Sequence, residues 1–203
     1  MMRSSKKGST PRRQPKQRRS QETVEAVLQA VVKILKRDGV DAVNTNRIAE
    51  VAGVSVGSVY QYFPDKRAIF LALHDRHADE IGRVIDRTVV EHAGENLEDL
   101  LRALIAALVD THAPDPELFA LLDVEVPHRT TSAQSLQTRL RNALRLALGA
   151  RGDGRREVER TLFVVAHMID GLTHGAVLDR PKSLSLAAAK DEIVKAVTAY
   201  LRS

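Results

Sequence analysis

The stretch Asn44–Lys66, NTNRIAEVAGVSVGSVYQYFPDK, decides the fold of this chain of 203 residues. Its apolar residues recur at helical spacing on both sides of Gly53, a position where a reversing chain often needs a positive φ. Ser55 can cap the second of the two helices, and Pro64 ends it because proline has no backbone N–H to donate. The stretch has the spacing of a DNA-binding helix-turn-helix, with a small residue, a turn glycine and an apolar anchor at Ala49, Gly53 and Val59.

A longer pattern also runs through this stretch, roughly I-A-x-x-A-G-V-S-x-G-x-[LIV]-Y-x-[HY]-F-x-x-K. The residues that match it are Ile48, Ala49, Ala52, Gly53, Val54, Ser55, Gly57, Val59, Tyr60, Tyr62, Phe63 and Lys66. In this pattern the chain resembles TetR/AcrR-type transcriptional regulators, and the match is far more specific than a bare helix-turn-helix. The resemblance implies an all-α fold with an N-terminal three-helix helix-turn-helix DNA-binding domain and a C-terminal helical domain for ligand binding and dimerisation.

The resemblance places the helix 56–63 in the major groove of DNA, where its side chains suggest separate roles. Val56 can meet a thymine methyl group, and Ser58 can bond either a base or a phosphate. Gln61 lies opposite the apolar face of the helix and can pair bidentately with adenine. We therefore expect these three residues to determine sequence preference.

Other residues of the motif suit the phosphate backbone. The hydroxyls of Tyr60 and Tyr62 can reach phosphates, although either ring can instead pack inside the small domain. Gly57 permits close approach of the backbone, and Ser55 begins a helix whose free N–H groups can seat a phosphate. Lys66 adds an ammonium group at the start of the next helix.

The start of the first motif helix supplies four further candidates for capping or DNA contact: Asn44, Thr45, Asn46 and Arg47. Arg47 occupies the acidic position of the capping box that is usual in the family. A cation at a helix start is unfavourable. We therefore hypothesise that Arg47 faces a phosphate.

Composition indicates a helical globular protein without thiol chemistry. Hydrophobic residues make up 43% of the chain and aromatic residues only 3%, so a core must be built mainly from Leu, Val, Ile and Ala. Cysteine is absent, which excludes disulfides and fits a reducing cytoplasm. We expect no cofactor.

Basic charge is concentrated at the N-terminus. Residues 1–20 contain eight Lys/Arg and no acidic residue, so the rest of the chain is slightly acidic although the whole carries +5. We expect residues 1–19 to be a disordered basic arm that contacts DNA phosphates, with a merely solubilising tail as the alternative. The arm has no apolar segment of the kind that a secretory signal needs.

Apolar periodicity predicts helices along the rest of the chain and no strand. A helix-turn-helix domain over 20–66 precedes a regulatory and dimerisation domain over 67–203. Val40 and Val43 should be buried, the segment 128–132 should be a polar loop, and no apolar run is long enough to span a membrane. Besides the two motif helices, the predicted helices are 20–37, 65–90, 97–109, 115–126, 134–148, 157–178 and 184–201, which makes nine.

The last two helices are predicted to form a homodimer interface. The penultimate helix is apolar on more than one face, and Gly171 and Gly175 lie one turn apart where they allow close helix approach. In the resembled family, such helices form a four-helix interface between two subunits. The expected interface residues are Ile169, Leu172, Thr173, Ala176, Val177, Ile193, Val194, Val197, Tyr200 and Leu201, with an ordinary intramolecular core as the alternative.

A ligand pocket is implied by the resemblance alone, because family members often hold an inducer among their middle helices. The candidate lining residues, each of which can also be plain core, are Phe119, Leu122, Val126, His128, Leu140, Leu144, Phe163, His167 and Met168. The histidines have no metal-ligand spacing, so no metal site is expected.

These observations predict a homodimeric transcriptional repressor that binds a palindromic DNA operator and is released by a small apolar effector. A ligand-independent regulator or an activator is the alternative. An enzyme is not expected, because the sequence contains no phosphate-binding glycine loop, nucleophile elbow or metal-ligand cluster.

Overall fold

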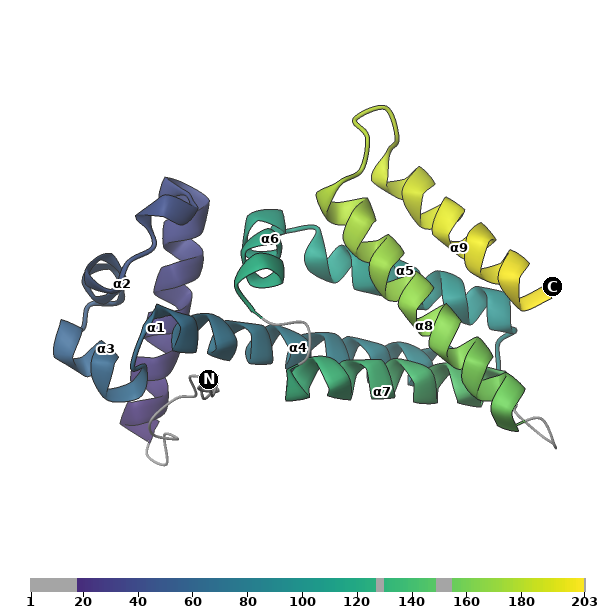
Figure 1. Cartoon of the computed structure of the whole chain (residues 1–203), viewed down its shortest axis with the longest axis horizontal. Helices are drawn as coiled ribbons and strands as arrows, with labels where there is room; N and C mark the ends of the chain where they lie inside the picture. Colours follow the sequence, from purple (N-terminus) through teal and green to yellow (C-terminus); the bar gives the residue numbers. More distant parts are fainter. Residues whose placement is uncertain (1–17, 127–129, 149–154, 203) are drawn as a thin grey trace, which may run out of the picture. The chain divides into compact units, whose positions relative to one another are not determined.

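The structure, a computed structural model, describes residues 18–126, 130–148 and 155–202. Within these residues it contains nine α-helices, one short 3-10 helix (Val40–Ala42) and no strand, which confirms the all-α prediction (Figure 1). The predicted basic arm lies outside the described residues, except that its last two residues begin the first helix. The helices are α1 (Arg18–Asp38), α2 (Thr45–Ala52), α3 (Val56–Tyr62), α4 (Lys66–Glu91), α5 (Leu97–His112), α6 (Pro116–Glu125), α7 (Thr131–Ala147), α8 (Arg155–Leu178) and α9 (Leu186–Arg202).

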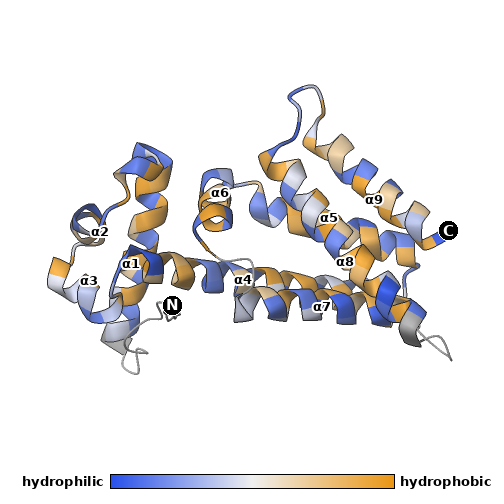
Figure 2. Cartoon of the chain, viewed as in Figure 1, coloured by the Kyte–Doolittle hydropathy of each residue, from blue (hydrophilic) through white to orange (hydrophobic). Residues whose placement is uncertain are grey.

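Two compact units divide the described residues. The first holds residues 18–76 and 117–126, and the second holds residues 77–116, 130–148 and 155–202. Each unit has its own apolar core, and α4 contributes to both, with Phe70 and Leu73 in the first and Ile81 and Ile85 in the second. Apolar and polar residues alternate around the helices, as amphipathic helices require (Figure 2).

The core of the first unit fixes the helix-turn-helix. From α1 it receives Val27, Val31 and Ile34, which are all fully buried. Ile48 of α2 and Val59 of α3 are also fully buried against this core. The two motif helices are therefore held by α1 and by the first turns of α4.

The turn between α2 and α3 follows the sequence prediction. Gly53 has φ 68° and ψ 32°, the left-handed conformation that ends a helix. Asn44 and Ser55 cap the two helices, since their side-chain oxygens accept the N–H groups of Arg47 and Ser58 at 3.0 Å each. Asp65 caps α4 in the same way, accepting the N–H of Ala68 at 2.8 Å.

Gly53→Ala is expected to destabilise the protein by about 1–2 kcal/mol, because a Cβ is unfavourable in the left-handed region. A Cβ at Gly53 would meet no atom within 4 Å, so the expected cost is conformational rather than steric. Thermal unfolding measures it, with Gly53→Asn as the matched control because asparagine tolerates this conformation. Equal losses for the two variants would contradict this explanation.

Three local predictions are wrong. Val40 is 48% exposed, because it begins the 3-10 helix after α1, and only Val43 is buried. The helix α7 begins at Thr131 inside the predicted loop, since the Thr130 hydroxyl accepts the N–H of Ala133 at 3.1 Å and caps it. The helix α1 begins at Arg18, two residues before the predicted start at residue 20.

In the second unit α8 packs against α5, α7 and α9. Leu162, Val165 and Ile169 of α8 are fully buried in this core. Contrary to the sequence expectation, the segment Glu157–Leu178 is apolar enough over sufficient length to cross a membrane, and 33% of its most apolar window is buried within the chain. The buried side explains part of this apolar character, because a core helix has the same composition.

Candidate functional site

The helix α3 has one buried face and one exposed face. Val59 is fully buried and Phe63, its C-cap, is 1% exposed, so this face anchors the helix to the first core. Gly57, Tyr60 and Gln61 are exposed on the rest of the helix. Polar and backbone groups of the predicted recognition helix are thus available to a partner.

The three predicted base-reading residues differ in their surroundings. Gln61 is exposed, so its amide is accessible for bidentate pairing. The Ser58 hydroxyl lies 2.7 Å from the Ser55 hydroxyl, and a base or phosphate contact would have to share or replace this bond. Val56 is half-buried and packs partly against the core, which leaves only part of its side chain exposed.

The two tyrosines of the motif lie on different sides of α3. Tyr60 is 46% exposed, and its hydroxyl is available for a phosphate. Tyr62 is only 8% exposed and belongs to the first core. Tyr62 therefore follows the packing alternative that the sequence left open, whereas Tyr60 keeps its predicted role as a candidate contact.

Lys66 makes internal contacts that the sequence did not suggest. Its Nζ donates to the carbonyl of Val43 at 3.3 Å, across 23 positions of the chain. The same Nζ lies 5.2 Å from the centre of the Phe70 ring, within the range of a cation–π contact. Lys66 thus ties the start of α4 to the segment before α2, and a phosphate would compete with these partners.

At the start of α2, Asn44 and Asn46 are exposed and Thr45 is half-buried. Arg47 is different, because its guanidinium is already bonded within the chain. Its Nη1 donates to Glu50 at 2.7 Å and its Nη2 to Asp38 at 3.3 Å.

Five of the nine predicted ligand-pocket residues are buried, but they lie in two different units. Phe119, Leu122 and Val126 are buried in the first unit, whereas Leu140 and Leu144 are buried in the second. The remaining candidates of α8 are Met168, which is half-buried, and Phe163 and His167, which are exposed, while His128 lies outside the described residues.

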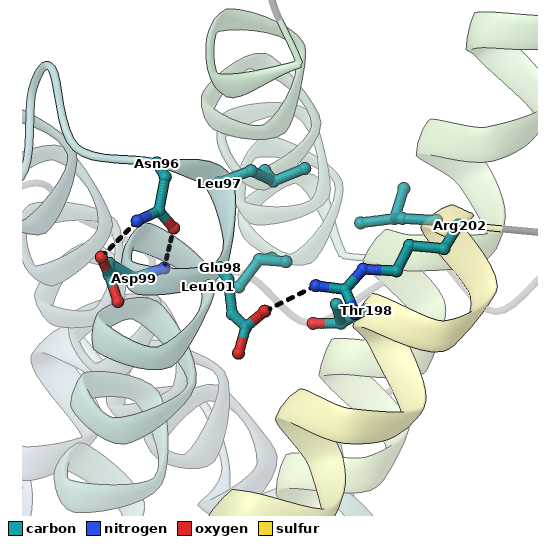
Figure 3. Close-up of a pocket in the computed structure, with 8 residues that line it drawn as sticks. Asn96, Leu97, Glu98, Asp99, Leu101, Thr198 and Arg202 are labelled. Atoms are coloured by element: carbon teal, nitrogen blue, oxygen red, sulfur yellow. Dashed lines mark hydrogen bonds and ion pairs between the residues drawn. The ribbon is translucent and has the colours of Figure 1, made fainter.

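One cavity of the second unit lies between the first turn of α5 and the last turns of α9 (Figure 3). It has a volume of about 550 Å³, and Arg202 Nη2 donates to Glu98 Oε2 at 3.0 Å beside it. None of the predicted ligand-pocket residues lines this cavity. Its lining residues are Asn96, Leu97, Glu98, Asp99, Leu101, Thr198, Leu201 and Arg202.

The residues predicted for a dimer interface are mostly buried within the chain. Ile193, Val194 and Val197 of α9 belong to the second core, as do Ile169 and Ala176 of α8. Thr173 is also buried, while Val177, Tyr200 and Leu201 are half-buried and Leu172 is 40% exposed.

The exposed face of α8 also carries residues that are not in the predicted interface set. Phe163 is 53% exposed, and its ring lies 4.2 Å from the ring of His167, measured between centres. A Cβ at Gly171 or Gly175 would meet no atom within 4 Å. This face is therefore partly apolar and has no bulky side chain at the two glycines.

Three histidines from three helices meet in the second unit, although they are far apart in the sequence. His77 Nε2 lies 2.9 Å from His112 Nδ1, and the rings of His112 and His174 are 5.7 Å apart between centres. Burial, reinforced by the charges of the two neighbouring histidines, lowers the pKa of His112 to about 3. No group of three or more His, Cys, Asp or Glu residues suited to holding a metal ion is found among the described residues.

An all-α chain whose exposed second motif helix is anchored by a three-helix core is a helix-turn-helix regulator of the kind that binds DNA. Residues 27–73 match the family described as "Bacterial regulatory proteins, tetR family", and residues 96–201 match "Tetracyclin repressor-like, C-terminal domain". The chain belongs to the TetR/AcrR family of transcriptional regulators. It is a DNA-binding regulator and not an enzyme.

Individual relatives are distant. The nucleoid occlusion factor SlmA of Glaesserella parasuis serovar 5 (strain SH0165) is 27% identical over 113 residues, which is 55% of this chain and 52% of that protein. The chain thus spans about half the length of this curated relative. A match of this extent does not establish that this chain shares the activity or the partners of that relative.

Solved structures share the fold. A TetR-family transcriptional regulator from Streptomyces coelicolor has a TM-score of 0.63 and 22% identity, covering 88% of this chain and 97% of that one. RolR in complex with the ligand resorcinol has a TM-score of 0.61 and 18% identity, covering 91% of this chain and 88% of that one. At these identities the likeness establishes the fold alone.

Proposed function

We propose that the protein is a homodimeric repressor that acts in the cytoplasm, binds a palindromic DNA operator through α3 and is released by a small apolar effector. The observation that carries DNA reading by α3 is its division into a buried anchor and an exposed face with Gly57, Tyr60 and Gln61. A two-fold dimer presents two such helices to successive major grooves, which requires a palindromic site. The basic arm before α1 adds phosphate contacts that depend on salt.

The exposed face of α8 supports the dimer proposal. Phe163 and Leu172 leave apolar surface uncovered on a helix that is apolar on more than one face. Gly171 and Gly175 permit a second helix to approach closely, since nothing stands where their side chains would be. The proposed interface is therefore the outer side of α8, with the buried residues of α9 supporting it from within the subunit.

Leu172→Glu combined with Phe163→Glu is expected to weaken the dimer by at least tenfold, because two charges would be buried without partners in an apolar interface. The measurement is the molar mass in solution across a concentration series. Val124→Glu is the matched control, because Val124 is 83% exposed on α6 and lies outside this face. A mass that is unchanged in the double variant would contradict the interface.

The effector proposal rests on family membership and on RolR, which holds resorcinol as its ligand. We propose a small apolar molecule within the second unit, which biases the protein toward a state with lower operator affinity. Of the candidates named from the sequence, the proposed lining keeps those of the second unit, which are Leu140, Leu144, Phe163, His167 and Met168, with Phe163 and His167 the least enclosed.

Screening small apolar compounds by thermal unfolding tests this proposal when the same compounds are assayed for operator binding. The expected result is a compound that raises the melting temperature and weakens operator binding together. If stabilising compounds leave operator binding unchanged, the ligand-independent regulator replaces the effector proposal. If they strengthen transcription from the operator while the protein stays bound, the protein is an activator.

A further inference from the structure

Two charged residues of the first unit have the wrong sign for their places in the helices. Arg47 lies in the first turn of α2, where the helix dipole disfavours a cation. Asp38 is the last residue of α1, where the dipole disfavours an anion. Each charge is unfavourable alone, and the two become favourable when they pair, as they do at 3.3 Å.

The pair belongs to a small network of charges. Arg47 Nη1 also donates to Glu50 at 2.7 Å, while Arg37 donates to both carboxylate oxygens of Asp38 at 2.7 and 2.8 Å. The side chains of Arg47 and Asp38 are 32% and 27% exposed, against 60% for Arg37 and 68% for Glu50. The hydrogen bond from Arg37 is the largest of the causes that bring the pKa of Asp38 down to about 2; burial opposes it, and the hydrogen bond from Arg47 adds a lowering effect smaller than either. The guanidinium of Arg47 is therefore already bonded to two carboxylates.

The backbone of Arg47 also takes part in the N-terminal cap of α2. Its N–H donates to the Asn44 side chain at 3.0 Å, and the Asn44 amide donates back to the carbonyl of Ala42 at 3.2 Å. Arg47 thus links two elements: its backbone N–H belongs to the cap of α2, and its side chain bonds Asp38 at the end of α1. The orientation of α3 depends on this joint, because α3 follows α2 after the tight turn at Gly53.

We infer that Arg47 is a positioning residue, which fixes α2 against α1 and so aims α3, and that it does not bind a DNA phosphate. The inference replaces the phosphate hypothesis drawn from the sequence, and it rests on the proposed reading of DNA by α3.

Arg47→Gln and Asp38→Asn separate positioning from phosphate contact, when the affinity of the full chain for its selected operator is measured across a salt series. Positioning predicts that both variants weaken binding, each by roughly three- to tenfold, with an unchanged salt slope. Phosphate contact predicts that Arg47→Gln lowers the slope by about 0.9. It also predicts that Asp38→Asn strengthens binding, because a carboxylate that competes for Arg47 is removed. Either of these last two results overturns the inference.

A charge exchange provides the rescue test. The double variant Asp38→Arg with Arg47→Asp restores an opposite-charge pair with signs that suit both helix ends. Because Arg37 and Glu50 then each lie beside a like charge, it is expected to recover only part of the lost affinity. Arg83→Gln, which removes an exposed arginine of α4 in the second unit, is the matched control and should change neither affinity nor slope.

Thermal unfolding distinguishes failure of this inference from failure of the proposed function. If the wild-type chain selects no DNA sequence, the proposed function fails. The Arg47–Asp38 pairing is then judged by a double-mutant cycle on the melting temperature. Non-additive losses support the pairing, and additive losses overturn it.

Discussion

Phe63→Ala is expected to abolish operator binding at 37 °C by loosening the recognition helix. Phe63 is 1% exposed at the end of α3, and replacing a buried phenylalanine by alanine typically costs about 3–5 kcal/mol. That loss is comparable to the whole stability of a small helical unit. The core of the second unit does not contain Phe63, so its helices should persist.

Far-UV circular dichroism and operator binding, measured on the same samples across temperature, check this expectation. The variant should lose part of its helical signal at low temperature and retain the rest to a higher temperature. Tyr60→Ala is the matched control, because it removes an exposed ring from the same helix and should leave the unfolding curve almost unchanged. Full operator affinity in Phe63→Ala at 37 °C would contradict the role assigned to this anchor.

His112 is expected to make the second unit acid-sensitive. Its pKa is lowered by burial to about 3 in the folded chain, against 6.5 for an ordinary histidine, so it stays neutral when folded and takes up a proton on unfolding. The neutral group therefore favours the folded state fully above about pH 6.5, and this advantage is lost as the pH falls toward 3. Between pH 7 and pH 5 the expected loss is about 2 kcal/mol.

Melting temperature as a function of pH measures this loss, and His112→Gln is the test variant. The variant removes the titrating group, so its melting temperature should fall less steeply between pH 7 and pH 5, whatever its stability at pH 7. His92→Gln is the matched control, because His92 is a partly exposed histidine paired with Glu95. An acid slope in His112→Gln equal to that of the wild type would show that another group is responsible.

Local chemistry explains why the helix-turn-helix could be predicted. The conformation of Gly53 and the caps at Asn44, Ser55 and Asp65 depend on residues within three or four positions, and the sequence displays those neighbours directly. The nine helices follow from apolar periodicity for the same reason.

Tertiary partners explain the parts of the site that the sequence did not reveal. Lys66 bonds a carbonyl 23 positions away, and Arg47 reaches an aspartate at the end of the preceding helix. Nothing in the spacing around either residue indicates those partners. The grouping of His77, His112 and His174 likewise depends on how three helices pack.

The rotation of a helix about its axis is a further limit on sequence prediction. Periodicity shows that α8 is apolar on more than one face, but it does not show which face meets the core. Phe163 proves to be exposed and Ile169 buried, so the proposed interface shifts toward Phe163, Gly171 and Gly175.

Selection from a random duplex DNA library by the full chain at physiological salt tests the central claim most directly. The predicted result is enrichment of an inverted repeat, with Gln61→Ala changing the preferred base at one position of each half-site because its amide no longer pairs there. Recovery of unenriched sequences, or enrichment that Gln61→Ala and Ser58→Ala leave unaltered, would contradict the reading of DNA by α3.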